Sequence, residues 1–392
     1  MWLSESKRFA PNGARIKFFS VAAYKHLAPN GAKTTVCEST LMRSRILLPD
    51  VSTPLRPETV AKRRWPINLR QDEQSLFSPD LERQIPATSL LKLNDVLVSP
   101  EGIIFKQRKI LIESFAFPWM WDEWRRDKVL RFLTRNYISR KRSRLDHDAL
   151  WITDNWSHGY FHWLADALMR LYSVRDLAGD LVLLLPYQYQ ELEFVHASLK
   201  PFGLGGLRFM GRNEVALCRQ LMVPTHTAPS GHFNEDVIQG VRDLLVNAYG
   251  EKKGTETDSR IYLSRGRAKR RTIVNEGEVL SVLGEFGFRA VYAEALSFAE
   301  QVNVFSRARF LVSNHGAGLT NMLFMSPGSS VLELRHQTDR VNNSYFTMAS
   351  ALGLDYYYQT CQPQRTGEEP HTANLVVNVH ALRENIELLT DR

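Results

Sequence analysis

Apolar residues follow two alternating patterns along most of the chain. Short, continuous apolar runs such as 181–185 and 310–313 have the length of buried strands. Between them lie longer segments, such as 234–249, whose apolar residues recur every three or four positions, as on one face of a helix. Strands that alternate with helices in this way predict a parallel, doubly wound α/β sheet.

The alternation begins near residue 149 and restarts after a polar, glycine-bounded stretch at 250–259. We expect strands at 149–153, 181–185, 220–223, 261–264, 290–292, 310–313, 330–334 and 355–358. We expect helices at 160–174, 192–200, 234–249, 276–286, 298–307, 317–324 and 344–352.

The region before residue 149 has a different character. Residues 93–105 read as a hairpin, and 114–135 as a helix rich in tryptophan. Residues 1–75 have weak periodicity and are expected to form a loosely ordered arm. The predicted domains are a basic extension at 1–88, an α/β domain at 89–250 and a second α/β domain at 260–392.

Length and charge sharpen this picture. A chain of 392 residues with 44% apolar residues exceeds one ordinary core, and no apolar run approaches the ~18 residues of a membrane span. The net charge of +8 comes from residues 1–70, where thirteen Lys and Arg face four Asp and Glu. A second basic patch contains Arg135, Arg140, Lys141, Arg142 and Arg144. Both patches suit phosphate-rich partners, and a solvated surface is the alternative.

The three cysteines, Cys37, Cys218 and Cys361, are far apart and form no CxxC or zinc-type cluster. This usage indicates a reducing compartment. The basic N-terminus lacks an apolar signal core, so we expect a cytoplasmic protein.

The clearest candidate site follows the predicted strand 310–313. It reads His315-Gly316-Ala317-Gly318 and leads into a predicted helix that contains Asn321. Glycines at such a turn let the backbone approach a phosphate, and the helix N-terminus attracts an anion. The alternative is a tight structural turn. Glu333, inside the next predicted strand, is expected to accept hydrogen bonds from a ribose or to form a structural ion pair.

A second candidate follows the predicted strand 261–264. Ser264 and Arg265 open a loop with five cations in seven residues, ending at Arg271, and Asn275 and Glu276 stand at the start of the next helix. We interpret this loop as a diphosphate site, with a solvated basic loop as the alternative.

The third candidate lies at 156–170. On a helix, His158, His162, Asp166 and Arg170 share one stripe, because they are four residues apart. A His/Asp stripe at a strand-to-helix junction suits a general base, whereas a metal site lacks further ligands at suitable spacing. The Asp146–Asp148 pair precedes a strand and is better read as a cap.

Three blocks of the chain resemble glycosyltransferase family 61, which shares the DUF563 domain. They are GYFHWLADALMRL at 159–171, SRx5RxIxNExE at 264–278 and HGAGLTNMLFMxPG at 315–328. The resemblance implies a GT-B-like fold, with two Rossmann-like domains facing a cleft, and inverting transfer from a nucleotide sugar in capsular or other surface polysaccharide synthesis.

Taken with the residues above, the resemblance implies a division of roles between an acceptor-side domain at 89–250 and a nucleotide-sugar-binding, Rossmann-like domain at 260–392. His162 or Asp166 would be the base, with His158 as a further candidate, and the 264–276 and 315–321 loops would bind the donor. We expect no metal or other cofactor, a glycan or lipid-linked glycan acceptor, and peripheral contact with an anionic membrane. A non-catalytic sugar-binding scaffold and a nucleic-acid binder are the alternatives, although no nucleic-acid-binding motif accompanies the basic arm.

Overall fold

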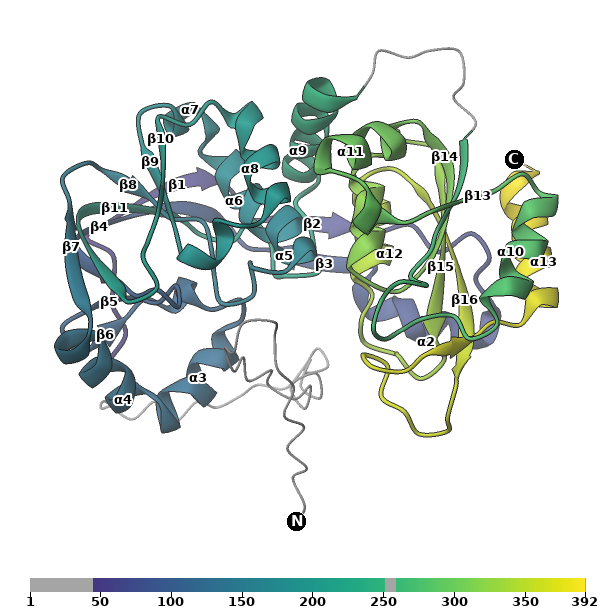
Figure 1. Cartoon of the computed structure of the whole chain (residues 1–392), viewed down its shortest axis with the longest axis horizontal. Coiled ribbons are helices and arrows are strands. Elements are labelled where there is room, and N and C mark those ends of the chain that lie inside the picture. The colour runs from purple at the N-terminus through teal and green to yellow at the C-terminus, as the bar shows by residue number, and fades with distance from the viewer. Residues whose placement is uncertain (1–44, 251–258, 392) are drawn as a thin grey trace. The chain divides into compact units, whose positions relative to one another are not determined.

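The computed structural model describes residues 45–250 and 259–391, with only the backbone at 125–127. Its described part holds two large sheets and one two-stranded sheet (Figure 1). The expectations for residues 1–44 lie outside the described residues.

The first sheet has nine strands and is mixed. Its strands are β1 (Val51–Arg56), β4 (Thr88–Val98), β5 (Ile104–Lys106), β6 (Lys109–Ile110), β7 (Lys141–Leu145), β8 (Ala149–Leu150), β9 (Val182–Leu185), β10 (Gly206–Phe209) and β11 (Glu214–Pro224). Strands β7 to β11 are parallel to their neighbours within this group, whereas β1, β4, β5 and β6 pair antiparallel. The expectation of a purely doubly wound first half is therefore wrong for its edge, where the predicted hairpin adds antiparallel strands.

The helices of this part follow the sequence pattern closely. They are α3 (Pro118–Asp127), α4 (Val129–Thr134), α5 (Tyr160–His162), α6 (Leu168–Ser173), α7 (Arg175–Ala178), α8 (Glu193–Leu199) and α9 (Glu235–Tyr249). One π-helical turn, Trp163–Ala167, joins α5 to α6, and another, Arg135–Ser139, extends α4. Asn234 caps α9 by accepting a hydrogen bond from the Val237 amide.

The second sheet is the more regular one. Its strands are β12 (Ser259–Leu263), β13 (Arg289–Val291), β14 (Ala308–Asn314), β15 (Ser330–His336), β16 (Asp355–Pro363) and β17 (Leu375–Val376). The spatial order is β13-β12-β14-β15-β16-β17, parallel except for β17. This is a 2-1-3-4-5 doubly wound order, and the predicted Rossmann-like sheet of this half is confirmed.

Alternate strand residues divide the core of the second half into two layers. Ile261 and Leu311 face α11 (Phe298–Ser306) and α12 (Ser344–Ala351), while Tyr262 and Val312 face α10 (Glu276–Glu285) and α13 (Val379–Thr390). Figure 1 shows these two helix pairs on opposite sides of the sheet. The predicted helix at 317–324 is a 3₁₀ helix, Ala317–Phe324.

The segment 45–88, part of the predicted extension, contains regular structure, although the residues up to 75 were expected to be loosely ordered. It holds β1, α2 (Gln74–Phe77), and the hairpin of β2 (Thr59–Lys62) and β3 (Glu82–Ile85). Phe77 is fully buried and packs its ring 4.8 Å from that of Tyr358, which anchors the segment to the second half. The expectation failed because β1 is held by backbone hydrogen bonds while most of its side chains are exposed. Its sequence therefore lacks the apolar pattern from which a strand is predicted.

Candidate active site

A histidine–aspartate pair lies on the helical segment that follows β8. His162 Nδ1 is 2.7 Å from Asp166 Oδ2, and the Ser230 hydroxyl donates to the same oxygen at 2.8 Å. The Asp166 side chain is 3% exposed and that of His162 is 23% exposed. Asp166 thus orients the imidazole through Nδ1, and Nε2 has no hydrogen-bond partner among the described residues.

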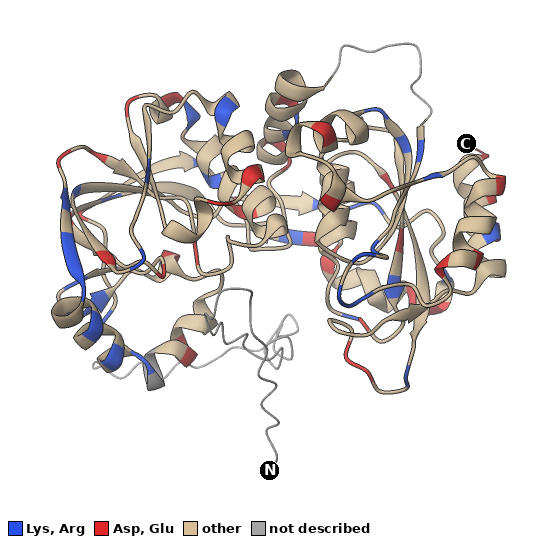
Figure 2. Ribbon diagram, viewed as in Figure 1, with Lys and Arg blue, Asp and Glu red and all other residues tan. Residues whose placement is uncertain are grey.

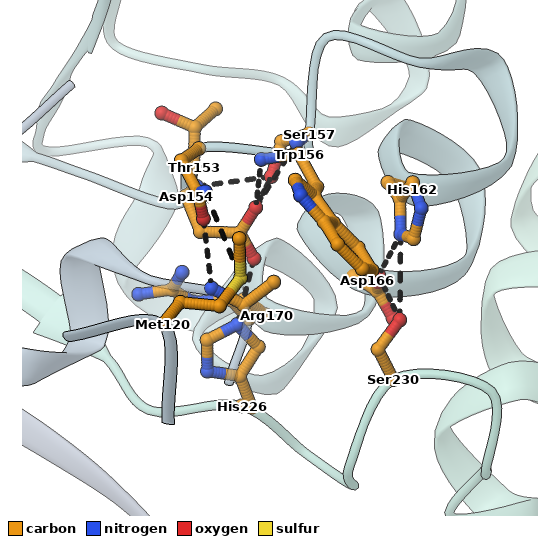
Figure 3. A network of polar contacts seen from close by, with 12 residues as sticks. Met120, Thr153, Asp154, Trp156, Ser157, His162, Asp166, Arg170, His226 and Ser230 are labelled. Carbon is orange, nitrogen blue, oxygen red and sulfur yellow. Dashed lines mark hydrogen bonds and ion pairs between the residues drawn. The ribbon is translucent and has the colours of Figure 1, made fainter. Parts of the chain in front are cut away.

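A second pair lies beside the first, across the Trp156 ring (Figure 3). His226 Nε2 is 2.8 Å from Asp154 Oδ2, while Asp154 Oδ1 accepts from the Trp156 and Ser157 amides. Burial alone would raise the pKa of Asp154, but the hydrogen bond and charge of His226, with the charge of Arg170, lower this pKa well below its usual range. Asp154 is therefore a buried anion at neutral pH.

Arg170 is close enough to both aspartates to interact with them electrostatically. Its side chain is fully buried, and Nε donates to the Pro224 carbonyl at 2.8 Å. Both terminal nitrogens lack a hydrogen-bond partner in the described part, and Arg170 interacts electrostatically with both Asp154 and Asp166. Arg170 holds the start of the 225–231 loop, which supplies both His226 and Ser230.

The third catalytic candidate, His158, is not brought to this pair. It is exposed, and its ring lies 5.7 Å from that of Tyr189. Helix α5 begins only at Tyr160, so His158 precedes the helix and does not share its stripe. The predicted four-residue stripe is accordingly correct for His162 and Asp166 and wrong for His158.

The donor candidates meet at the topological switch point of the second sheet. The strand order reverses between β12 and β14, and in doubly wound sheets ligands bind beyond the carboxyl ends of such a strand pair. Arg265 follows β12 and Gly316 follows β14. A Cβ built on Gly316 would lie 2.5 Å from Arg265 Nη1, so the guanidinium lies directly over this glycine.

Arg265 and Arg271 form a pair of neighbouring cations in this place. Burial, then the charge of Arg265, lowers the pKa of Arg271 to about 10, and burial also lowers the pKa of Arg265. The Nε atom of each is buried without a hydrogen-bond partner, and no carboxylate of the described residues lies within ion-pair distance of either. Both stay charged at neutral pH, so an anion bound here would offset their repulsion.

Three of the other predicted donor residues shape this loop. Glu276 accepts hydrogen bonds from Ser264 at 2.6 Å and Tyr262 at 2.9 Å, and Ser264 accepts from the Gly266 amide. The Asn275 side chain donates through Nδ2 to the Val377 carbonyl and accepts through Oδ1 from the Val377 amide. Asn275 is the N-cap residue of α10 but makes no side-chain cap there.

His315 and Glu333 form a third histidine–carboxylate pair. His315 Nδ1 lies 2.5 Å from Glu333 Oε1, and Tyr356 donates to the other oxygen. Glu333 is fully buried, and its pKa is lowered because the charge and hydrogen bond of His315 outweigh the effect of burial. Of the two interpretations of Glu333, the structure shows the structural ion pair, because the side chain is fully buried and both of its oxygens already accept hydrogen bonds.

Asn321 is likewise fully buried. Tyr160 donates to its Oδ1 at 2.7 Å, and its amide donates to Gln301 at 3.0 Å. It joins the helical segment of the first half to α11 and does not face a ligand. Of the 315–321 residues, His315, Gly316, Ala317 and Gly318 remain at the strand end where a ligand would lie.

A line of aromatic rings connects the two groups of candidates. The His162 ring lies 5.1 Å from that of Phe161, which lies 5.7 Å from Tyr345, which in turn lies 5.0 Å from His315. Tyr345 also donates to the Gly316 carbonyl at 2.7 Å. These packed rings connect the base candidate to the turn after β14.

A cavity of about 280 Å³ lies at the same edge of the second sheet, beyond β15 and β16. It is lined by polar side chains, among them His336, Gln337, Thr338 and Gln362. His371 follows the lining residue Pro370 and interacts electrostatically with both Glu369 of the cavity and Arg271.

Within the described residues, no group of three or more His, Cys, Asp or Glu side chains could hold a metal ion. Asp146 is exposed and lies 3.6 Å from Arg144, and Asp148 lies 3.8 Å from Arg219. No helix of the described part is long and apolar enough to cross a membrane.

Sequence reasoning missed Asp154, His226, Ser230 and Tyr345 as site residues. A usable signal existed for the first two, because β8 and β11 are parallel neighbours and their carboxyl ends meet at one edge. Asp154 follows β8 by a few residues, and His226 follows β11. The predicted strand at 220–223 had no recognised parallel partner, so these two residues were not connected.

Comparison with known proteins agrees with this geometry. Residues 160–332 match the family model described as Glycosyltransferase 61, a stretch that contains the His162–Asp166 pair, the 264–276 loop and the 315–318 turn. The chain is thus similar to the glycosyltransferase 61 family over this stretch, which is less than half of its length. The resemblance read from the sequence is confirmed.

Curated relatives match over parts of the chain. The chain is 40% identical over 111 residues to protein O-linked-mannose beta-1,4-N-acetylglucosaminyltransferase 2 of Takifugu rubripes, covering 27% of this chain and 18% of that protein. It is 36% identical to the Bos taurus protein of the same name, covering 41% and 30%. It is 33% identical to the EGF domain-specific O-linked N-acetylglucosamine transferase of Drosophila melanogaster, covering 35% and 29%. The chain thus spans less than a third of the length of these relatives.

Proposed function

We propose that the protein is an inverting glycosyltransferase that moves a sugar from a nucleoside-diphosphate sugar to a hydroxyl of a glycan or glycoprotein. The observation that carries the proposal is the placement of Arg265 over Gly316 at the sheet switch point, connected through Tyr345 and Phe161 to the His162–Asp166 pair. One site then contains both an anion-binding element and a general base.

The donor half rests on electrostatics. The diphosphate of the donor lies against Arg265 and Arg271, with the 315–318 backbone close by. Two half-buried cations without carboxylate partners among the described residues attract an anion, and they stabilise the charge that develops on the leaving diphosphate. The cavity beyond β15 and β16 would take the nucleoside, since its amide and hydroxyl side chains suit a base or ribose.

The acceptor half of the proposal rests on the His162–Asp166 pair. His162 Nε2 takes the proton of the acceptor hydroxyl as its oxygen bonds to the anomeric carbon, and the bond from that carbon to the diphosphate breaks on the opposite face. Asp166 holds the ring through Nδ1 and stabilises the imidazolium that forms. This arrangement favours His162 over Asp166 as the base, because the carboxylate is buried and already accepts two hydrogen bonds.

For the sugar, the names of the relatives favour N-acetylglucosamine, and their acceptors, by name, are O-linked mannose on protein and EGF domains. We propose an N-acetylhexosamine donor for this chain. A surface or capsular polysaccharide, or a lipid-linked glycan, remains our alternative acceptor. The proposed setting is the cytoplasm, at an anionic membrane, because the cysteines are isolated and the N-terminal arm is basic.

The test is a binding screen of UDP-, GDP-, CMP- and dTDP-sugars by thermal shift, followed by calorimetry with the preferred donor. Arg265→Ala and Arg271→Ala should each weaken binding roughly ten- to a hundredfold, as expected for lost charge-assisted hydrogen bonds. Arg267→Ala is the matched control, because Arg267 lies in the same loop but is exposed and stacks 4.3 Å from the Tyr292 ring. Unchanged affinity in both site variants would refute the donor site, and donor binding without transfer to any acceptor would favour the non-catalytic scaffold.

A further inference from the structure

The second basic patch of the sequence belongs to a surface that the proposed site does not use. Helix α4 and its π-helical extension present Leu130 and Ile138 to solvent, each 79% exposed. Thr134 lies midway between them and is also exposed. From Leu130 to Thr134 the chain makes about one turn of α-helix, and from Thr134 to Ile138 about one turn of π-helix. The three residues therefore lie on the same side of the helix.

Cations surround this stripe. Arg131 and Arg135 flank it on the helix, and β7 continues with exposed Lys141 and Arg142. Figure 2 shows the concentration of Lys and Arg along α4 and β7. Arg142 lies 5.3 Å from the Tyr137 ring centre, and Tyr137 donates to the carbonyl of Gln107, next to Arg108 and Lys109 of the β5–β6 turn. We call this surface the α4–β7 face.

The rest of the helix is firmly anchored, so the face is a fixed feature. Val129 and Asn136 are buried, and Phe132 and Tyr137 pack against Phe105 at 5.2 and 5.4 Å. Arg140 forms a two-pronged ion pair with Glu101 and also donates to Asn136 at 2.7 Å. Among the described residues, no carboxylate lies within ion-pair distance of Lys141 or Arg142.

We propose that the α4–β7 face docks on an anionic lipid surface, with Leu130 and Ile138 entering the headgroup region and the surrounding cations contacting lipid phosphates. Exposed apolar side chains with basic neighbours on one helix side are what an interfacial helix presents to a membrane. A nucleic acid or acidic polysaccharide would use the cations but would leave Leu130 and Ile138 in water. Residues 1–44 carry seven Lys and Arg against two Glu, so their like charge disfavours them as the occupant.

The first test reads the environment of single positions in the full chain. Ile138→Cys and Leu130→Cys are labelled with the fluorophore NBD in a Cys37→Ser background. Burial raises the pKa of the Cys218 and Cys361 thiols to about 12, so these cysteines stay unlabelled. Leu388→Cys on α13, a site 42% exposed in the native chain, is the matched control.

On vesicles containing phosphatidylglycerol, the emission of labels at 130 and 138 should shift to the blue, and the label at 388 should not shift. Vesicles of phosphatidylcholine alone should produce no shift. Protein that sediments with anionic vesicles without a shift at 130 and 138 would overturn the proposal, as would absence of sedimentation or equal shifts on neutral vesicles.

The second test removes charge. Lys141→Gln together with Arg142→Gln should lower the partition coefficient onto anionic vesicles roughly 25-fold, at about fivefold per cation. Arg289→Gln with Arg309→Gln, on exposed positions of the second half, should leave it unchanged. An unchanged partition coefficient for the first pair would contradict the proposal, as would binding to a short RNA that is stronger than binding to vesicles and depends on these cations.

Discussion

At the scale of single residues, a buried carboxylate beside a partly exposed histidine occurs three times. The exposed fractions of carboxylate and histidine side chains are 3% and 23% for Asp166 and His162, 1% and 18% for Asp154 and His226, and 0% and 12% for Glu333 and His315. In each pair the carboxylate fixes the orientation of the ring. Two of the histidines, His162 and His315, bond their carboxylate through Nδ1, whereas His226 bonds Asp154 through Nε2. Of these two, only His162 leaves Nε2 without a hydrogen-bond partner among the described residues, because Asn342 lies 3.0 Å from Nε2 of His315.

The lowered pKa of Asp154 makes a prediction about stability. A group whose folded-state pKa lies below its unfolded value of about 3.8 stabilises the fold above that pH and loses this contribution as the pH falls through and below it. The free energy of unfolding of the native chain should therefore exceed that of Asp154→Asn clearly at pH 7. Urea denaturation at several pH values should show this difference narrowing below about pH 4. A difference that is constant with pH would contradict the assignment.

At the scale of elements, the loops beyond parallel strands decide the chemistry. The glycine turn after β14 was predictable from its sequence. Its contact with Arg265 was not, because this contact depends on the pairing of β12 with β14, which a local sequence pattern does not reveal. Most helices were predictable because each buries one face, as α9 does through Val237 and Val241. The π-helical geometry of Trp163–Ala167, inside the predicted helix 160–174, was not predictable, because all five residues are buried and no alternation of buried and exposed positions reveals the helical period.

The long strand β11 shows the same limit. Only 220–223 was predicted, but the strand begins at Glu214 and pairs on one side with β4 and on the other with β7 and β8. Exposed Arg219 interrupts the apolar run, so hydrophobicity alone ends the strand too early. The residues of β11 before 220 are held in the strand by pairing with β4 and β7, which are distant in the sequence. A short stretch of sequence cannot reveal such pairing.

A glycine substitution tests the turn after β14. In Gly316→Ala the new Cβ would lie 2.5 Å from Arg265 Nη1, and the flexible guanidinium must move to make room. Donor affinity should fall about tenfold or more while thermal stability changes little. Gly284→Ala is the control, since no atom lies within 4 Å of its built Cβ, and it should keep full affinity. Native donor affinity in Gly316→Ala would exclude Arg265 from the donor site.

At the scale of the whole molecule, our proposal has both large sheets supply one site. The first half contributes His162, Asp166 and the 225–231 loop, and the second contributes the cation pair and the glycine turn. Contacts of the loop with α12 join them, since Thr347 donates to the Gly231 carbonyl at 2.5 Å. A division into a donor half and an acceptor half follows, and a GT-B-like arrangement remains our prediction for the assembly of the two.

The composition of this site predicts that transfer needs no divalent metal. In our proposal Arg265 and Arg271 stabilise the leaving diphosphate, as a metal ion does in other glycosyl transfers. Initial rates should be the same with and without excess EDTA. Loss of turnover with chelator, restored by Mn²⁺ or Mg²⁺, would show that a metal stabilises the leaving group.

The central claim is that His162, oriented by Asp166, deprotonates the acceptor at a site whose donor is held by Arg265 and Arg271. The most direct measurement is the turnover number of His162→Ala together with its donor dissociation constant, with His196→Ala as a control histidine that bonds only the Gln190 carbonyl. The account predicts a kcat lowered by about 10²–10⁴-fold for His162→Ala at unchanged donor affinity, and native values for His196→Ala. A native kcat in His162→Ala would contradict it.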